Sequence, residues 1–185
     1  MDLLFALLAG YALGSLPFAY WLGRWRGVTL TSLGTGNPGA ANLFRQSSRR
    51  LGVMAGALDM AKGASAVLVG RWLGLPSEVA LASGAAAVVG HWHSPFLGFR
   101  GGAGLATAIG VGLGAAPIAS TIGLAVGVAT TAIGRNVGRG GGFGWTTYLG
   151  VSIALGDRWP LIGGVVGLGL VVLLRTLLLD RRRAA

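Results

Sequence analysis

The sequence predicts an all-α integral membrane protein, and its composition and patterning both support this fold class. Hydrophobic residues make up 53% of the 185 residues and charged residues only 11%, whereas soluble domains carry about 25% charged residues. Mean hydropathy is +0.69. The apolar residues come in long runs without a polar face, and the alternation that a membrane β-barrel needs is absent. Because lipid offers the backbone no hydrogen bonds, the membrane spans should be helices.

Seven apolar runs are candidates for membrane crossings, each of which takes about 20 residues. The first run begins at Asp2 with no basic segment before it, so we interpret it as a span and not as a signal peptide. The fourth and sixth runs are short and could be tilted or re-entrant. We expect a single membrane-embedded domain over residues 1–185. The predicted spans are 3–23, 52–73, 79–98, 103–116, 117–133, 143–156 and 160–179.

The arginines predict the orientation of these spans. With the N-terminus outside, eleven arginines fall in cytoplasmic segments and two in external ones, which agrees with the positive-inside rule and places the C-terminus in the cytoplasm. The net charge of +10 then indicates contact with anionic phospholipid headgroups and not with nucleic acid. The inner set is Arg24, Arg26, Arg45, Arg49, Arg50, Arg100, Arg135, Arg139, Arg181, Arg182 and Arg183, and the outer set is Arg71 and Arg158.

The sequence has 35 glycines and no cysteine. Small residues let membrane helices approach closely, and this packing role accounts for most of the glycines. The absence of cysteine excludes disulfides and thiolate metal sites. Other glycines gather in three polar segments that the predicted orientation places on the cytoplasmic side: 34–39, 99–104 and the Arg/Gly-rich stretch 134–144. Three polar loops on one membrane face predict a single interfacial site.

The first of these loops has the composition of a phosphate-binding loop. Glycine leaves backbone N–H groups uncovered, and arginine forms forked, charge-assisted hydrogen bonds with phosphate. The alternative is a solvated polar turn whose arginines bind lipid headgroups. The candidate residues are Gly34, Thr35, Gly36, Asn37, Gly39, Asn42 and Arg45.

A pair of opposite charges lies inside the second predicted span. Asp59 and Lys62 are three residues apart and therefore share a helix face. Charges within a membrane are costly, and they usually face the protein interior or a wet cavity. We interpret the pair either as a substrate contact or as a mutually neutralising structural pair.

Two histidines lie near the inner end of the third predicted span. His91 and His93 point to opposite sides of a helix, so a shared metal site is not expected. The chain has no other histidine and few carboxylates, and the sequence therefore predicts no metal. Three roles are open for His91: a proton donor, a hydrogen-bonding anchor or an interfacial residue.

A glycine-rich turn opens the fourth predicted span. Free N–H groups at a helix N-terminus bind anions, so this turn is a second candidate phosphate site. It is not a P-loop, because the Gly-Lys-Ser/Thr ending and the preceding strand are missing. The candidate binding residues are Arg100, Gly101, Gly102 and Gly104.

Four segments, in this order and spacing, resemble the bacterial acyl-phosphate-dependent glycerol-3-phosphate acyltransferases. They are GSLPF at 14–18, GTGNPGAAN at 34–42, DMAKG at 59–63, and GH at 90–91 followed by FRGGAGLAT at 99–107. The resemblance covers about residues 10–110. It implies a seven-helix enzyme of the bacterial inner membrane with an external N-terminus. It also implies that an acyl group passes from acyl phosphate to the 1-hydroxyl of glycerol 3-phosphate, giving lysophosphatidic acid without a metal or other cofactor.

The resemblance further implies that the 34–45 segment and the 100–104 turn each hold a phosphate, and that Thr35, Arg45 and His91 act in catalysis. Positioning and oxyanion-type stabilisation would supply the rate enhancement. Asp59 and Lys62 would belong to the substrate site.

Several positions depart from the family pattern. Family members carry serine at Thr35, threonine at Ala41 and lysine at Ala103, and the preceding Asp-Ile-Arg is replaced at 29–31. The family's third motif and its C-terminal His…Asn segment have no counterpart that we can align. The sequence therefore leaves three functions to compare: an active acyltransferase, a degenerate homologue that binds a lipid precursor or a partner without turnover, and, least favoured, a small transporter.

Overall fold

The computed structural model describes the backbone of residues 1–184 and the side chains of residues 1–178. Within this part the chain contains helices and no strand, so the predicted all-α class is confirmed. The elements are α1 (Asp2–Ser15), α2 (Phe18–Trp25), α3 (Ala40–Gln46), α4 (Arg49–Trp72), α5 (Ser77–Trp92), the 3₁₀ turn η1 (Pro95–Leu97), α6 (Leu105–Ala115), α7 (Pro117–Gly134), α8 (Val137–Ala154) and α9 (Trp159–Ala184).

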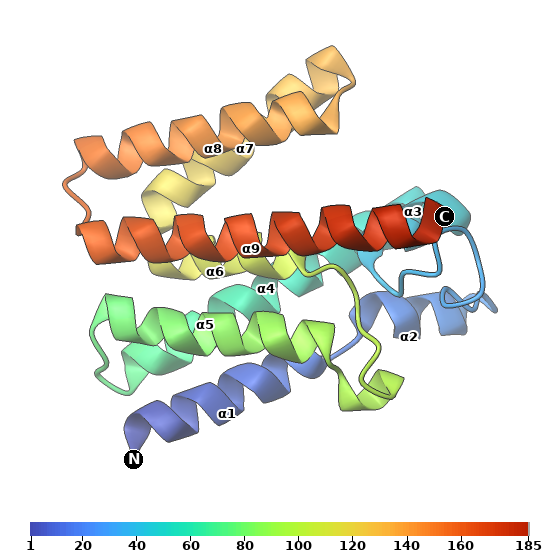
Figure 1. The fold of residues 1–185 in the computed structure, drawn as a ribbon, viewed down its shortest axis with the longest axis horizontal. Coiled ribbons are helices and arrows are strands. Elements are labelled where there is room, and N and C mark those ends of the chain that lie inside the picture. Colours follow the sequence, from blue (N-terminus) through green and yellow to red (C-terminus); the bar gives the residue numbers. More distant parts are fainter. Residues whose placement is uncertain (185) are drawn as a thin grey trace.

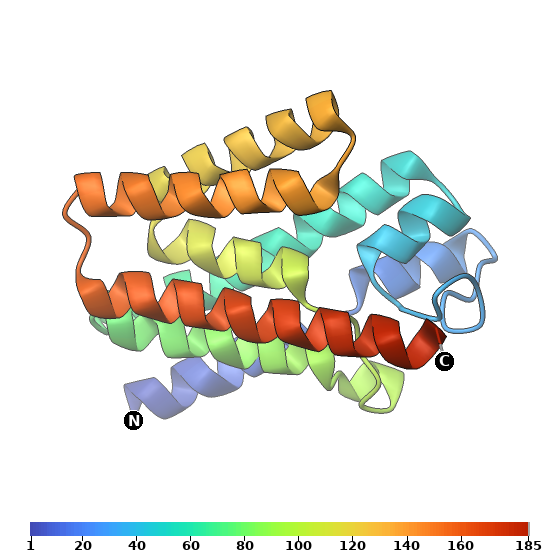
Figure 2. The ribbon, with the colours of Figure 1, turned by 45° about the horizontal axis from the view of Figure 1, so that its top comes forward.

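The helices run side by side, and the connections that contain the candidate loops meet at one end of them (Figure 1). The N-terminus and the α4–α5 and α8–α9 connections lie at the opposite end, and Figure 2 shows the same separation from a second direction. The end with the loops is the end to which the arginine pattern assigns most of the basic residues. The side chains of Arg181, Arg182 and Arg183 lie outside the described part of the chain.

Among the described residues, four stretches are long and apolar enough to cross a membrane by length and composition: Asp2–Trp25, Arg49–Trp72, Pro117–Gly134 and Trp159–Leu178. Two predicted spans are shorter as helices than the sequence indicated. The predicted span 79–98 ends as an α-helix at Trp92, and the predicted span 103–116 forms only the 11 residues of α6, from Leu105 to Ala115. The residues between these two helices form a loop instead.

The first predicted span, 3–23, is wrong as one continuous helix. Proline has no N–H and pushes the residue before it out of the helical region. Leu16 accordingly takes an extended conformation with φ −65° and ψ 115°, α1 ends at Ser15, and α2 begins at Phe18 after Pro17. The break frees two main-chain carbonyl groups, those of Ser15 and Leu16, for partners elsewhere in the fold.

Glycines at the helix crossings allow backbones to touch, as the sequence predicts. A Cβ added to Gly10 of α1 would collide with the carbonyl oxygen of Ser83 on α5. A Cβ on Gly63 of α4 would collide in the same way with the carbonyl oxygen of Thr107 on α6. Close packing of this kind is the main source of attraction between helices in lipid, and it fixes α4, α5 and α6 around the buried charges described below.

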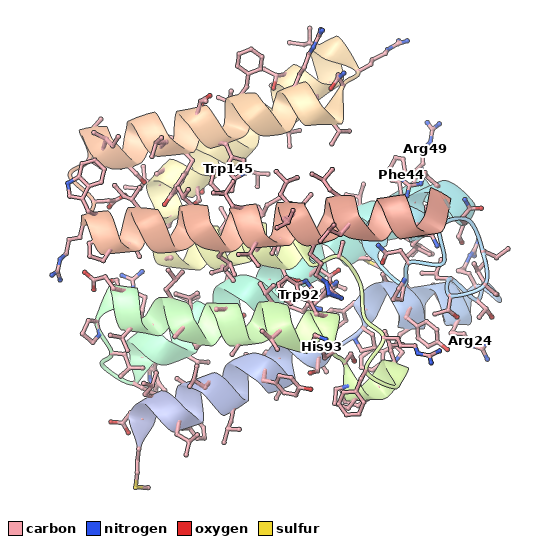
Figure 3. The ribbon with its side chains drawn as sticks, in the orientation of Figure 1. Arg24, Phe44, Arg49, Trp92, His93 and Trp145 are labelled. Carbon is pink, nitrogen blue, oxygen red and sulfur yellow. The ribbon has the colours of Figure 1, made fainter. Side chains whose placement is uncertain are left out.

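The interpretation of 134–144 as a third polar loop is wrong. Only Arg135 and Asn136 connect α7 to α8, and the glycine-rich residues that follow are helical. The Asn136 side chain accepts a hydrogen bond from the Arg139 N–H at 2.9 Å and so caps α8. Capping and close packing against α7 outweigh the low helix propensity of glycine. Trp145 of α8 lies between α8 and α9 (Figure 3), where it fills the space above Gly169.

Candidate active site

A buried charge cluster occupies the interior where the middle of α4 meets the C-terminal end of α5. Lys62 and Asp59 are each 3% exposed, and the Lys62 Nζ lies 2.8 Å from the Asp59 Oδ1. The predicted pairing on one helix face is therefore confirmed. Lys62 also lies 2.8 Å from the Nδ1 of His91, which comes from α5. Because the two charges neutralise one another, they are tolerated in an interior that would exclude either alone.

The break between α1 and α2 completes this cluster. Lys62 donates its third hydrogen bond to the carbonyl oxygen of Leu16 at 2.8 Å, a group that a continuous helix would have used internally. The neighbouring carbonyl of Ser15 accepts a hydrogen bond from the hydroxyl of Ser94, at 2.6 Å, in the loop after α5. The helix break at Pro17 thus provides carbonyl acceptors for a residue of α4 and for a residue of the loop after α5.

The contact with Lys62 fixes the orientation of the His91 ring. An ammonium group has three N–H donors and no acceptor, so the Nδ1 of His91 must accept and the ring proton resides on Nε2. That Nε2 faces Gly102, because a Cβ added to Gly102 would lie 2.5 Å from it and 3.2 Å from the Oδ1 of Asn37. Asn37, His91 and Gly102 therefore form a junction at which the two glycine-rich loops meet, and we call it the loop junction.

The first loop is closed upon itself by Asn42, which is 1% exposed. Its amide nitrogen donates to the carbonyl oxygens of Leu30 and Leu33 at 3.1 and 2.9 Å, and its Oδ1 accepts from the Thr35 N–H at 3.3 Å. The N–H groups of Gly36 and Gly39 are also bonded inside the loop. The expectation that the glycine N–H groups of this loop are uncovered is wrong for Gly36 and Gly39, because the Leu33 carbonyl and the Asn37 side chain accept their hydrogen bonds.

The second loop is open by comparison. The Gly101 N–H donates to the carbonyl oxygen of Trp92 at 2.8 Å. Within the described residues, the N–H groups of Gly102, Ala103 and Gly104 donate to no protein acceptor. Gly104 takes a φ of +91° as it starts α6, a conformation that favours glycine. The indole N–H of Trp92 donates a hydrogen bond to the carbonyl oxygen of Ala103 at 2.8 Å and so stabilises the turn. The predicted helix N-terminus with free N–H groups is therefore present.

The remaining predicted residues differ in exposure and in contacts. Thr35, Arg45 and Arg100 are exposed, and their side chains form no hydrogen bond or ion pair with any described residue. Gly34, with a φ of +57°, packs against the side chain of Asn42. His93 is exposed, and its carbonyl oxygen accepts a hydrogen bond from Tyr11. Figure 3 shows Trp92 beneath α9 near the centre of the molecule, and Arg24 and Arg49 farther toward the loop end.

A small pocket opens beside the cluster, lined by Leu16, Phe18, Pro38, Lys62, His91 and Gly102 among others. Sequence reasoning missed the carbonyl of Leu16, the hydroxyl of Ser94 and the indole of Trp92. The signal for the carbonyl was present, because a proline inside an apolar run predicts a broken helix. No group of three or more His, Cys, Asp or Glu side chains that could hold a metal ion occurs in the described part of the chain.

Comparison with known proteins identifies close structural and sequence similarity. The fold superposes on a crystal structure of PlsY, an integral membrane glycerol 3-phosphate acyltransferase in its glycerol 3-phosphate form, with a TM-score of 0.84 and 28% identity over 98% of this chain and 92% of that one. The lysophosphatidic acid form gives a TM-score of 0.81, with coverage of 95% and 88%.

Sequence relatives carry the same description. A glycerol-3-phosphate acyltransferase of Geobacter sulfurreducens is 37% identical over 88% of this chain and 81% of its own length. Glycerol-3-phosphate acyltransferase 1 of Deinococcus radiodurans is 47% identical over 58% of this chain. The chain spans about half the length of that relative and of one from Dehalococcoides mccartyi, 54% and 50% respectively.

The apolar helices and the integral membrane neighbours establish a multi-pass helical membrane protein. The family model described as glycerol-3-phosphate acyltransferase matches residues 4–176. The match extends well past the 10–110 region in which the sequence motifs were found, and it includes α7, α8 and most of α9. The chain belongs to the glycerol-3-phosphate acyltransferase family.

Proposed function

We propose that this chain transfers a fatty acyl group from acyl phosphate to the 1-hydroxyl of glycerol 3-phosphate. An ester C–O bond forms, the bond between the acyl carbon and the phosphate oxygen breaks, and the hydroxyl proton leaves with inorganic phosphate. The product is lysophosphatidic acid, and no metal or other cofactor takes part. Family membership and the glycerol 3-phosphate and lysophosphatidic acid forms of the PlsY structures support this proposal.

The reaction takes place on the cytoplasmic face of the bacterial inner membrane, among membrane phospholipids. The chain crosses the membrane seven times as one domain, with its N-terminus outside and its C-terminus in the cytoplasm. Two observations support this orientation: most arginines fall in the segments at the loop end, and the N-terminus lies at the opposite end of the helices (Figure 1). Arginine-rich loops remain preferentially on the cytoplasmic side during membrane insertion.

The loop junction is the observation that carries the proposal. Negative charge develops on the carbonyl oxygen of the acyl group in the transition state, and donors fixed in advance stabilise it. The Nε2–H of His91, held by Lys62, is such a donor. The N–H groups of Gly102, Ala103 and Gly104 supply further donors toward a phosphate or the same oxygen. In this role His91 donates a hydrogen bond and does not act as a general base.

The other candidate residues fall into two groups: exposed side chains, and residues that shape the loops and the buried cluster. Thr35, Arg45 and Arg100 are exposed side chains that contact the substrate phosphates from the rim of the site, and Asn37 lies at the junction itself. A second set shapes the site: Asn42, Gly34, Gly36 and Gly39 set the first loop, Gly101 and Gly104 set the turn, and Asp59 and Lys62 hold His91.

Lysophosphatidic acid formation by the purified protein tests the proposal. The protein in detergent is given acyl phosphate and glycerol 3-phosphate, and acyl-CoA replaces acyl phosphate in the control reaction. We expect product from acyl phosphate only. Product from acyl-CoA alone, or from neither donor with folded protein at high concentration, would contradict the proposed reaction.

A degenerate homologue without turnover is the second candidate function, and Ala103 favours it. The family's lysine is replaced there by a methyl group, which removes a cation from a site that receives two phosphorylated substrates. A homologue of this kind would still bind glycerol 3-phosphate in calorimetry but would form no lysophosphatidic acid. That pair of results would place this candidate first.

A further inference from the structure

Positive charge is scarce in the interior of the loop junction. Lys62 is paired with Asp59 at 2.8 Å, so the buried cluster contributes no net charge to a bound anion. Two phosphorylated substrates bring several negative charges into a partly dry site, where unbalanced charge is costly. Ala103 supplies only a methyl group. Arg100 precedes the turn but is exposed to solvent, so a buried cation close to the 101–104 turn has to come from another element.

Arg175 of α9 is placed to supply this charge. The centre of its guanidinium group lies 4.7 Å from the centre of the Trp92 ring. The indole of Trp92 in turn donates to the carbonyl oxygen of Ala103 at 2.8 Å. One side chain therefore separates the Arg175 charge from the turn whose N–H groups are free. The Arg175 Nε atom is buried in the protein, so this arginine faces the helix bundle and not the lipid.

We propose that Arg175 provides the cation for the substrate phosphate held at the 101–104 turn, replacing the charge that lysine supplies at the Ala103 position in related acyltransferases. This inference rests on the proposed function. Stacking on an aromatic ring uses the face of a guanidinium, whereas its N–H donors lie in the plane and bind phosphate oxygens in pairs. A charge inside a membrane span usually marks a substrate site.

Ligand binding tests this assignment independently of turnover. Calorimetry in detergent measures the affinity of glycerol 3-phosphate and of a non-hydrolysable acyl phosphonate for the wild type and for Arg175→Gln. We expect at least a tenfold weaker affinity for one of the two ligands, which corresponds to the loss of one strong charge-assisted contact. Arg158→Gln is the matched control, because Arg158 lies at the opposite end of α9, 77% exposed, and pairs with Glu78 at 2.8 Å. Its affinities should equal those of the wild type.

A second substitution separates charge from packing. Ala103→Lys introduced into Arg175→Gln should restore most of the lost affinity, since it returns a cation to the same turn. Unchanged affinity for both ligands in Arg175→Gln would overturn the proposal. So would weakened affinity that Ala103→Lys does not restore, because Arg175 would then only support Trp92. If the glutamine variant is not monodisperse, Arg175→Met keeps the length of the side chain, and the same outcomes apply. A wild type that binds both ligands without forming product would refute the proposed function and leave this inference testable.

Discussion

The two glycine-rich loops have nearly the same composition but differ in what their backbones can bind. In the first loop, the side-chain oxygen of Asn42 accepts a hydrogen bond from the Thr35 N–H, and that of Asn37 accepts one from the Gly39 N–H. In the second, the N–H groups from Gly102 to Gly104 donate to no acceptor among the described residues. The first loop is therefore a rigid support that presents side chains, whereas the second presents its backbone. The number of glycines does not decide which loop can bind an anion; the acceptors that lie within reach do.

The difference extends to the residues beneath each loop. Under the turn, His91 is held by a buried lysine that itself depends on the broken first helix. Under the first loop, the apolar residues Leu30 and Leu43 are completely buried. The chemistry is accordingly expected at the turn, and the first loop is expected to contribute affinity.

The largest expected effect follows from adding a methyl group at the turn. Gly102→Ala would place a Cβ 2.5 Å from the His91 Nε2, so the ring or the turn must move. We expect kcat/KM for acyl phosphate to fall by about 10²–10³-fold, the usual consequence of losing one oxyanion donor. Gly163→Ala on α9 is the control, since nothing lies within 4 Å of a Cβ there. Equal activity of the two variants would show that the junction is not where the reaction occurs.

Removing the lysine beneath the turn is the next largest effect. Lys62→Met leaves Asp59 buried without its partner, which costs about 3–5 kcal/mol of stability, and it releases His91. The double variant Asp59→Asn/Lys62→Met has no unpaired charge. We expect it to regain most of the thermal stability while its activity stays low, because His91 is still not oriented. Recovery of activity together with stability would mean that the cluster serves packing alone.

A smaller effect is expected in the first loop. Asn42→Ala leaves the carbonyls of Leu30 and Leu33 without their donor, and each buried group without a partner costs about 1–3 kcal/mol. The loop should loosen, and the KM for glycerol 3-phosphate should rise with little change in kcat. Steady-state kinetics at saturating acyl phosphate would show this division. A fall in kcat alone would place the reaction at the first loop.

The smallest effect is expected at the rim of the junction. Arg100 is exposed and forms no hydrogen bond or ion pair with any described side chain, and exposed charges contribute only about 0–1 kcal/mol. Arg100→Gln should change kcat/KM by less than about fivefold, which corresponds to that range. The difference should shrink further as salt is added. A larger effect that persists at high salt would indicate a buried phosphate contact.

The fold was largely predictable because its main signals are local. Apolar runs without a polar face predicted membrane helices, and the spacing of Asp59 and Lys62 predicted a shared face, which their 2.8 Å contact confirms. The family resemblance is likewise confirmed. Errors arose where tertiary contacts overrode local preference. The stretch after Asn136 is helical despite its glycines because it packs on α7, and Pro17 breaks a run that composition alone presents as continuous.

The site was less predictable because its geometry depends on contacts between distant segments. No pattern in the sequence shows that Lys62 contacts His91 or that the Leu16 carbonyl accepts a hydrogen bond from Lys62. Nor does any pattern show that α9 places Arg175 over the Trp92 ring. The residue types in both loops were recognisable, but the acceptors that close the first loop and leave the second open come from the folded arrangement. Local composition therefore locates the site and does not assign the roles within it.

A structure of the protein with a non-hydrolysable acyl phosphonate would test the contrast between the loops most directly. We predict that its phosphonate oxygens lie within hydrogen-bond distance of the backbone N–H groups of Gly102 to Gly104, and that its acyl oxygen lies within hydrogen-bond distance of the His91 Nε2. A phosphonate bound only to the 34–39 loop, with the turn unliganded and His91 remote from the acyl oxygen, would contradict this account.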